Sequence, residues 1–407
     1  MATVYFARWV LLPDCTILDN GAVAVDGTTI EAVGRRGAVR RSRTDRMVNL
    51  GELLLMPGLI NLHTHLEEGV LRGTLDLEEP YAARFAKKNA RLRQADRRSV
   101  VTAVRLGVRE LLTNGVTTVL DTSRLGYSAG VLAEEPVRAW VHHEVQPGPA
   151  EEEDACVASL ADRLRQAPAA VGTAVGPHAL FSLSPRGHRR TIDLAREAGS
   201  RWACHIAESA DELQAFSEQT GDLHFHLTRR RPWPYGDNPG GPMHYAVTGN
   251  MVPNGGICFH CNYATGNDLA LLAVKQVHVV VCSRYSDEVR HKPLSLDLAL
   301  RRGIRVSIGT ESAAESPGLS VFDELYLLRR QNPDLPPGDL LAMATRNPAA
   351  ALGMAGKLGA LAPGHFADMI GVHVPHDPQG DLLSELLSEE PTVGFVMVNG
   401  EEVIVDA

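Results

Sequence analysis

The pattern of apolar and polar positions divides the chain into two β-rich ends and a middle in which helices and strands alternate. Short runs of β-forming residues, separated by turn signals, lie at 4–7, 21–25, 29–33, 366–372 and 393–400. Such runs predict a small antiparallel sheet or sandwich. Because both ends have this character, we expect one composite β-sandwich built from residues 1–56 and 357–407.

The middle of the chain, residues 57–356, repeats a helix–strand unit. Apolar residues recur at helical spacing from Asp96 to Asn114, Gly115 provides a helix stop, and Val116–Leu120 follows as a strand. Further units pair 154–166 with 171–175, 191–198 with 201–204, 268–275 with 277–281, and 294–301 with 304–308. This repetition predicts an α/β fold with a parallel sheet, either a closed (β/α)8 TIM-like barrel or an open doubly wound sheet. No G-x-G-x-x-G follows a strand, which argues against the dinucleotide-binding alternative.

Composition narrows the class of protein. The chain has 407 residues, 44% of them hydrophobic, enough for a large core. Its net charge is -9, and its longest block of like charge is Glu151–Asp154, so a nucleic-acid surface is not expected. The basic run Arg229–Arg231 is short and typical of a solvated loop.

Cysteine usage and targeting signals predict a reducing cytoplasm. Six cysteines are scattered without a disulfide-like framework. Cys258 and Cys261 form a single C-x-x-C, which we interpret as small buried strand residues and not as a structural zinc site. No signal peptide pattern and no apolar stretch of about 18 residues is present, so no membrane partner is expected.

The most informative motif is His63-Thr64-His65, which ends the apolar run Met56–Leu62. Side chains alternate along a strand, so both imidazoles face the same side. A pair of surface histidines is the ordinary explanation of such a tripeptide. The strand context and further histidines downstream favour metal ligands instead.

Other polar residues lie where later apolar runs end. They are His178, His205, Glu208, His260 and Glu311. Each alone is typical of a loop histidine or a surface carboxylate. In a barrel, however, the carboxyl ends of all strands meet at one mouth, where such enzymes carry out their chemistry. The sequence therefore predicts that these side chains converge.

Ligand chemistry assigns roles within this group. Catalytic zinc takes imidazole and carboxylate ligands and keeps one position for water, whose pKa it lowers toward ~7. The residues that fit this ligand set are His63, His65, His205 and Glu311. Glu208 could then shuttle protons, and His260 could hydrogen-bond the attacking water.

Longer segments around these residues carry a family resemblance over nearly the whole chain. They are Met56–Asn61, His63–Leu66, Gly115–Val119, His178–Pro185, His205–Ser209, His260–Tyr263, Gly309–Ser312, Asn347–Ala349 and Leu358–Asp368. In these segments the chain resembles the amidohydrolase superfamily, specifically its metal-dependent aminohydrolases. That branch includes cytosine, guanine, S-adenosylhomocysteine and aminodeoxyfutalosine deaminases, together with triazine chlorohydrolases.

The resemblance implies the same ligands and adds a substrate contact. It makes His63 and His65 ligands from the first barrel strand and His205 the ligand from the fifth. His178 resembles a histidine that contacts substrate in purine-type deaminases. Some superfamily members bridge two metals with a fourth-strand lysine carbamate, but Val171–Pro177 contains no lysine. We therefore expect one divalent metal ion, zinc, with iron as the alternative.

Two positions depart from the family pattern. The family aspartate that serves as ligand and general base after the eighth strand is Glu311 here. Its extra methylene shifts the carboxylate by ~1.5 Å on a fixed backbone, and a misplacement of ~1 Å can cost ~100-fold in rate. The family's Cys-Pro-Arg-Ser after the seventh strand reads Cys282-Ser283-Arg284-Tyr285-Ser286. The site is thus either adapted to another substrate or weakened.

The predicted function is hydrolytic deamination of a heterocyclic amine by metal-activated water, with Glu208, His260 and Glu311 as catalytic residues. A purine nucleoside-like substrate is expected, because His178 and the His205-x-x-Glu208 pair resemble purine-type deaminases. A chlorohydrolase or a cyclic-amide hydrolase on the same site is the nearest alternative. A non-catalytic metal-binding relative is a second one, suggested by Glu311. The expected partner is a small molecule; a homo-oligomer stays open.

Two segments are candidates for walls of the site. Residues 228–256, between the fifth and sixth strands, contain Trp233 and Tyr235 among many glycines and prolines. Long insertions at a barrel mouth act as lids or specificity elements, although a decorated surface loop explains this one equally well. The helix-rich stretch Leu77–Arg98 is a second candidate wall.

Overall fold

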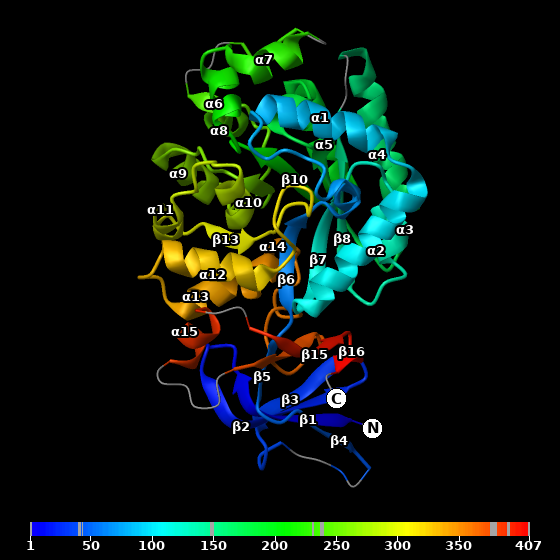
Figure 1. The fold of residues 1–407 in the computed structure, drawn as a ribbon, viewed down its shortest axis with the longest axis vertical. Helices are drawn as coiled ribbons and strands as arrows, with labels where there is room; N and C mark the ends of the chain where they lie inside the picture. The colour runs from blue at the N-terminus through cyan, green and yellow to red at the C-terminus, as the bar shows by residue number, and fades with distance from the viewer. Residues whose placement is uncertain are drawn as a thin grey trace.

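Two sheets organise the molecule, one built from the ends of the chain and the other from its middle (Figure 1). The computed structural model describes residues 2–39, 42, 44–146, 150–229, 232–236, 240–374, 381–388 and 391–405. The terminal sheet lies at one end of the molecule, together with the labelled N- and C-termini. This arrangement confirms the predicted barrel with a composite β-domain from both chain ends. The boundaries at 56/57 and 356/357 stay predictions.

The terminal sheet has eight strands in the order β16-β15-β14-β5-β1-β2-β3, with β4 paired to β1. They are β1 Thr3–Leu11, β2 Ile17–Asp26, β3 Thr29–Arg35, β4 Arg46–Asn49, β5 Leu53–Pro57, β14 Met369–His373, β15 Val393–Val398 and β16 Glu401–Val405. A flat sheet would hold β1 and β15 roughly 14 Å apart. The rings of Tyr5 and Phe395 from these strands are 5.6 Å apart, so the sheet curls over its own apolar core like a sandwich.

Pairing within this sheet differs from the antiparallel pattern expected. β1 pairs in parallel with β4 and β5, while its pairing with β2 is antiparallel. After β3 the chain crosses back before forming β4 and β5, so these two strands run in the direction of β1.

The second sheet is the barrel, whose eight neighbouring strands are all parallel and follow sequence order. They are β6 Leu59–Thr64, β7 Val116–Ser123, β8 Arg138–Val145, β9 Gly172–Pro177, β10 Arg201–Ile206, β11 Ile257–His260, β12 His278–Val281 and β13 Arg305–Ile308. The pattern of the sequence did not reveal β8. Its apolar run is interrupted by His142, His143 and Glu144, all of which are buried.

Helices cover the outside of the barrel and separate its strands (Figure 1). The longer ones are α1 Tyr81–Gln94, α2 Arg97–Thr113, α4 Glu153–Gln166, α5 Pro185–Glu197 and α12 Val321–Gln331. The shorter ones are α3 Ser128–Leu132, α6 Ala210–Ser217, α7 Gly221–Thr228, α8 Gly241–Thr248, α9 Gly266–Val274, α10 Ser283–Glu288, α11 Leu296–Arg301, α13 Pro337–Met343, α14 Arg346–Ala351 and α15 Leu382–Leu386. Three 3-10 turns complete them: η1 Leu66–Leu71, η2 Ala150–Glu152 and η3 Leu180–Ser182. Among the described residues, no helix is both long and apolar enough to span a membrane.

The helix α2 shows how sequence signals set these elements. The side chain of Asp96 accepts a hydrogen bond from the backbone N–H of Ser99 and caps the helix. The apolar positions at helical spacing, Val100, Val104 and Val108, are fully buried. The predicted stop is also observed, because Gly115 follows with a φ of +77°.

The barrel closes between β13 and β6 through the segment that follows β13. The backbone N–H of Thr310 donates to the carbonyl of His63 (2.9 Å), and the Asn61 amide donates to the Thr310 hydroxyl (2.7 Å). This closure brings Glu311 beside the end of β6. Because β5 leads directly into β6, the carboxyl ends of the barrel strands point away from the terminal sheet (Figure 1).

Candidate active site

A bulge in β6 sets the direction of the two histidines of the His-x-His motif. Ile60 and Leu62 pack in the barrel interior, and the register of β6 against β7 then shifts between Asn61 and Thr64. Such a shift changes which residues face inward. Consequently His63 also faces the interior, where its ring stacks on Phe259 at 3.8 Å.

Sharp backbone turns direct the other site residues at the ends of β10, β11 and β13. Ala207, His260 and Glu311 have φ values of +55°, +68° and +58°. Non-glycine residues rarely adopt this left-handed conformation, and those that do concentrate at functional sites. The strain indicates that the fold holds these strand ends in one specific geometry.

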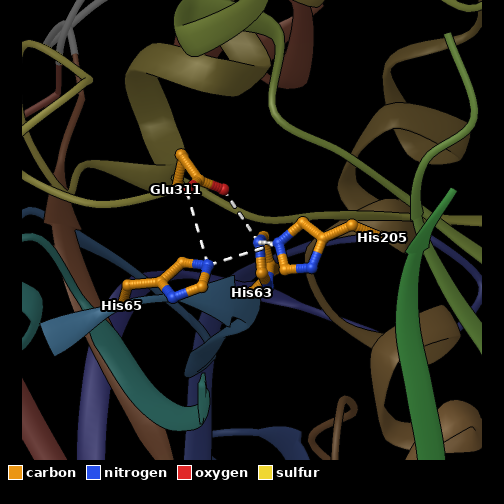
Figure 2. A group of neighbouring side chains, drawn as sticks. All are labelled: His63, His65, His205 and Glu311. Atoms are coloured by element: carbon orange, nitrogen blue, oxygen red, sulfur yellow. Dashed lines mark hydrogen bonds and ion pairs between the residues drawn. The ribbon is translucent and has the colours of Figure 1, made fainter. Parts of the chain in front are cut away.

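The predicted ligand set converges at the carboxyl end of the barrel (Figure 2). One nitrogen or oxygen from each of His63, His65, His205 and Glu311 lies within 4.8 Å of those of the other three. His205 Nε2 lies 3.1 Å from His63 Nε2 and 3.3 Å from His65 Nε2. Glu311 Oε2 lies 2.8 Å from His63 Nε2, and Glu311 Oε1 lies 3.4 Å from His65 Nε2. All four side chains are buried.

The protonation states of this cluster suit a cation. Burial lowers the pKa of His63 to about 3 and holds the pKa values of His65 and His205 well below the usual range. The imidazoles are therefore neutral at pH 7 and offer lone pairs. Burial raises the pKa of Glu311 to about 7. A cation between these groups would keep this carboxylate ionised.

Hydrogen bonds on the far side of the rings select the tautomer that a metal requires. The Nδ1 of His205 lies 2.5 Å from the carbonyl of His178, so it carries the proton and leaves Nε2 unprotonated. The Nδ1 of His63 faces the Thr122 hydroxyl at 3.4 Å. The unprotonated Nε2 of His205 lies close to the Nε2 atoms of both His63 and His65, an arrangement in which a divalent ion would receive lone pairs from all three rings. The donor set thus fits a metal.

Glu208 lies at the same cavity and is held by two tyrosines. The Tyr285 hydroxyl donates to Glu208 Oε1 (2.6 Å), and the Tyr81 hydroxyl donates to Oε2 (3.3 Å). Burial opposes ionisation of Glu208, but His260, His291 and the Tyr285 hydrogen bond lower its pKa to about 2. This carboxylate is therefore ionised and oriented.

His260 approaches the cluster from β11. Its Nε2 lies 3.6 Å from Glu311 Oε2, and neither ring nitrogen has a hydrogen-bond partner among the described residues. A fully buried imidazole without partners is costly. The ring is therefore available to a water or substrate atom.

His178 follows β9 and is fixed by groups that sequence reasoning missed. Its Nδ1 lies 2.8 Å from Glu144 Oε2, and Arg124 donates through Nε to Glu144 Oε1 (2.8 Å). Burial raises the pKa of Glu144, but His178 and Arg124 outweigh it and hold the value well below the usual range. Glu144 lies near the carboxyl end of β8. Because the apolar pattern did not reveal this strand, the position of Glu144 could not be predicted from the sequence.

A second group that the sequence did not reveal comes from α1. Arg84 and Lys88, one helical turn apart, are buried and both pair with Glu315. Lys88 also lies 3.1 Å from Glu68. A sequence pattern places such charges on a solvent-facing side. Only their pairing with Glu315, which follows β13 far away in the sequence, explains the burial.

A cavity of about 10 Å³ lies beside the His/Glu cluster. Its lining is Tyr81, Arg84, Phe85, Lys88, His178, His205, Glu208, Tyr285, Glu311 and Glu315. Four of these belong to α1, so the predicted wall at 77–98 does border the site. Of segment 228–256 the structure describes 228–229, 232–236 and 240–256, and none of these residues lines the cavity. Arg230 and Arg231 lie outside the described residues, and the segment's role in substrate choice stays a prediction.

Comparison with known proteins agrees with the fold. Residues 54–403 match the model of the amidohydrolase family. The 5-methylthioadenosine/S-adenosylhomocysteine deaminase of Nitratidesulfovibrio vulgaris is 30% identical over 377 residues, covering 88% of this chain and 80% of the relative.

Two solved structures share the fold. An adenosine deaminase from Xanthomonas campestris with bound zinc superposes with a TM-score of 0.83 at 23% identity, covering 99% of this chain and 93% of that one. A mutant of atrazine chlorohydrolase from Arthrobacter aurescens, complexed with zinc and atraton, also has a TM-score of 0.83, at 20% identity, covering 99% and 95%.

Proposed function

The chain belongs to the amidohydrolase family, and we propose that it is a metal-dependent aminohydrolase of a purine nucleoside-like substrate. It would replace an amino group on the heterocycle by hydrolysis and release ammonia. The observation that carries this proposal is the convergence of three neutral imidazoles and a carboxylate beside an ionised Glu208. The deaminase identity of the curated relative supports the reaction type.

We propose one divalent ion, zinc, held by the four residues of the cluster in Figure 2. Three imidazoles and a carboxylate are ligands that zinc accepts, and both solved structures named above contain zinc. Bound there, the ion would supply an activated water at neutral pH.

The chain's own residues would then move protons and orient the substrate. Glu208 is ionised and therefore able to take a proton from water and deliver it to a ring nitrogen. Tyr285 holds this carboxylate in place. His260, whose ring nitrogens lack partners among the described residues, would hydrogen-bond the attacking water. His178, fixed by Glu144, would contact the heterocycle.

Metal analysis and a substrate panel test this function. Zinc-loaded protein is expected to release ammonia from adenosine or 5′-methylthioadenosine, to lose this activity when chelated, and to regain it with zinc. Chloride release from atrazine without ammonia from the nucleosides would replace the deaminase proposal by the chlorohydrolase. Absence of both products from zinc-loaded protein would refute an amidohydrolase activity on these classes.

A matched pair of histidine variants tests the ligand assignment. His205→Asn is expected to abolish both metal retention and activity. His244→Asn serves as the control, because His244 is 44% exposed on α8. Equal metal content in the two variants would contradict the assigned site.

A further inference from the structure

Arg84, whose guanidinium interacts with Tyr285, also places at the reaction cavity a buried nitrogen that has no well-formed hydrogen bond. Its Nε donates to Glu315 Oε1 (2.9 Å), and its Nη1 donates to the carbonyls of Glu79 (3.0 Å) and Leu77 (3.4 Å). Its Nη2 is buried and has no hydrogen-bond partner among the described residues. The side chain is only 2% exposed, so bulk solvent does not reach this group.

The position of Arg84 puts that donor in the path of a substrate. Arg84 lines the inner cavity with Glu208 and Glu311. It also lines a larger cavity of about 230 Å³ that includes Tyr263 and His291. The side chain therefore stands between the metal cluster and the space outside it, and a heterocycle that brings its amine to the cluster passes Nη2.

Charge balance around Arg84 decides what kind of acceptor it can select. Glu315 lies between Arg84 and Lys88, and Lys88 has a second carboxylate partner in Glu68. The two cations are thus already neutralised by two buried carboxylates. A phosphate or carboxylate on the substrate would find no uncompensated positive charge here and would face the ionised Glu208. A neutral acceptor meets no such repulsion.

Entry of a ring requires α1 side chains to move, because the inner cavity of about 10 Å³ holds no more than one water. Arg84 is tied by Nη1 to carbonyls of the segment that leads into α1. It therefore keeps its orientation relative to that helix while the bond to Glu315 stretches.

We propose that Arg84 is a specificity-determining residue that donates a hydrogen bond from Nη2 to a neutral acceptor of the substrate heterocycle, a purine ring nitrogen other than the one that Glu208 protonates. Because Arg84 and Lys88 are already paired with carboxylates, the site favours uncharged nucleosides over phosphorylated ones. This inference rests on the proposed deaminase function. A hydrogen bond from a charged donor is worth about 10- to 100-fold in discrimination.

A cycle between protein variants and substrate analogues tests the proposal on the zinc-loaded protein. The probes are adenosine, 3-deazaadenosine, 7-deazaadenosine and adenosine 5′-phosphate, with kcat/KM for ammonia release as the readout. Arg84→Lys keeps a cation for Glu315 but removes the second amino group. Arg91→Met, an exposed arginine on the same helix, is the control and should match the wild type.

Arg84→Lys is expected to lower kcat/KM for adenosine by about 10- to 100-fold. On the deaza analogue that lacks the contacted nitrogen, the same variant should cause little further loss. The wild type should prefer adenosine to its 5′-phosphate. A Tm close to that of the wild type would show that the variant is folded; if it is not, Arg84→Gln replaces it in the same cycle.

Three outcomes would overturn the proposal. Equal losses on every analogue would make Arg84 a purely structural residue, and no loss on any would show that Nη2 is not used. A loss confined to the 5′-phosphate would assign Arg84 to an anionic group. Absence of ammonia from all probes with wild-type protein would instead refute the proposed function itself, so the two failures are distinguishable.

Discussion

Shortening Glu311 to aspartate is expected to damage the metal site, because the structure uses the full length of the glutamate. Glu311 Oε2 lies 2.8 Å from His63 Nε2. Removing one methylene withdraws the carboxylate by about 1.5 Å and leaves it roughly 4 Å from that imidazole on an unchanged backbone. The backbone has little freedom to follow, since Glu311 donates its N–H to the His63 carbonyl and accepts from the Thr64 hydroxyl at 3.0 Å.

The expected result of Glu311→Asp is lower zinc retention and a kcat/KM reduced by about 100-fold, the loss that a displacement of about 1 Å can cause. Metal content after dialysis against a chelator and the rate of ammonia release measure the two effects. Glu134→Asp is the control, because Glu134 is 69% exposed. If Glu311→Asp retained more zinc and gained activity, the glutamate would be a defect, and the native chain would be a non-catalytic relative.

Three further perturbations follow from the buried network. Lys88→Met removes the cation shared by two buried carboxylates and should lower the free energy of unfolding in urea by about 3–5 kcal/mol. The control Lys87→Met breaks a half-exposed pair and should lower the free energy of unfolding by at most about 1 kcal/mol. Equal losses in the two variants would contradict the burial argument. Tyr285→Phe removes a hydrogen bond that orients and stabilises ionised Glu208, so the pKa of Glu208 should rise from about 2 and the loss of kcat should grow as the pH is lowered; an unchanged kcat at every pH would contradict the role of Tyr285 in holding Glu208. Arg138→Met breaks a bidentate pair that joins the barrel to the terminal sheet and should lower Tm while leaving kcat/KM of the folded protein unchanged; a loss of kcat/KM alone would refute that structural role.

Sequence patterns predicted those parts of the fold in which local signals and tertiary burial agree. The helix at Arg97–Thr113 has the predicted apolar spacing and glycine stop, and the structure adds an acidic cap from Asp96. The convergence of His63, His65, His205 and Glu311 was predictable for a similar reason, because each lies at or just beyond the carboxyl end of an apolar strand. Parallel strands bring such ends together whatever the intervening sequence.

The missed features depend on contacts between distant parts of the chain. The bulge that turns His63 inward arises from the pairing of β6 with β7. The residues of β6 alone do not predict it. β8 carries polar residues that become acceptable in a core only when Glu144 meets Arg124 and His178. Local periodicity cannot report partners of that kind.

Charge balance links these distant contacts to the metal. Four carboxylates are buried around the cavity, namely Glu68, Glu208, Glu311 and Glu315. Arg84 and Lys88 from α1 supply two positive charges, and the histidines of the cluster are neutral. Buried charges must be paired or coordinate a metal, so the two remaining negative charges call for one divalent cation. Burial raises the pKa of Glu311 to about 7, and the nearby carboxylates of Glu315 and Glu208 raise it as well, which is the direction expected when no cation balances the charge. The same balance leaves no net charge for an anionic substrate, which is why α1 contributes hydrogen-bond specificity and not charge attraction.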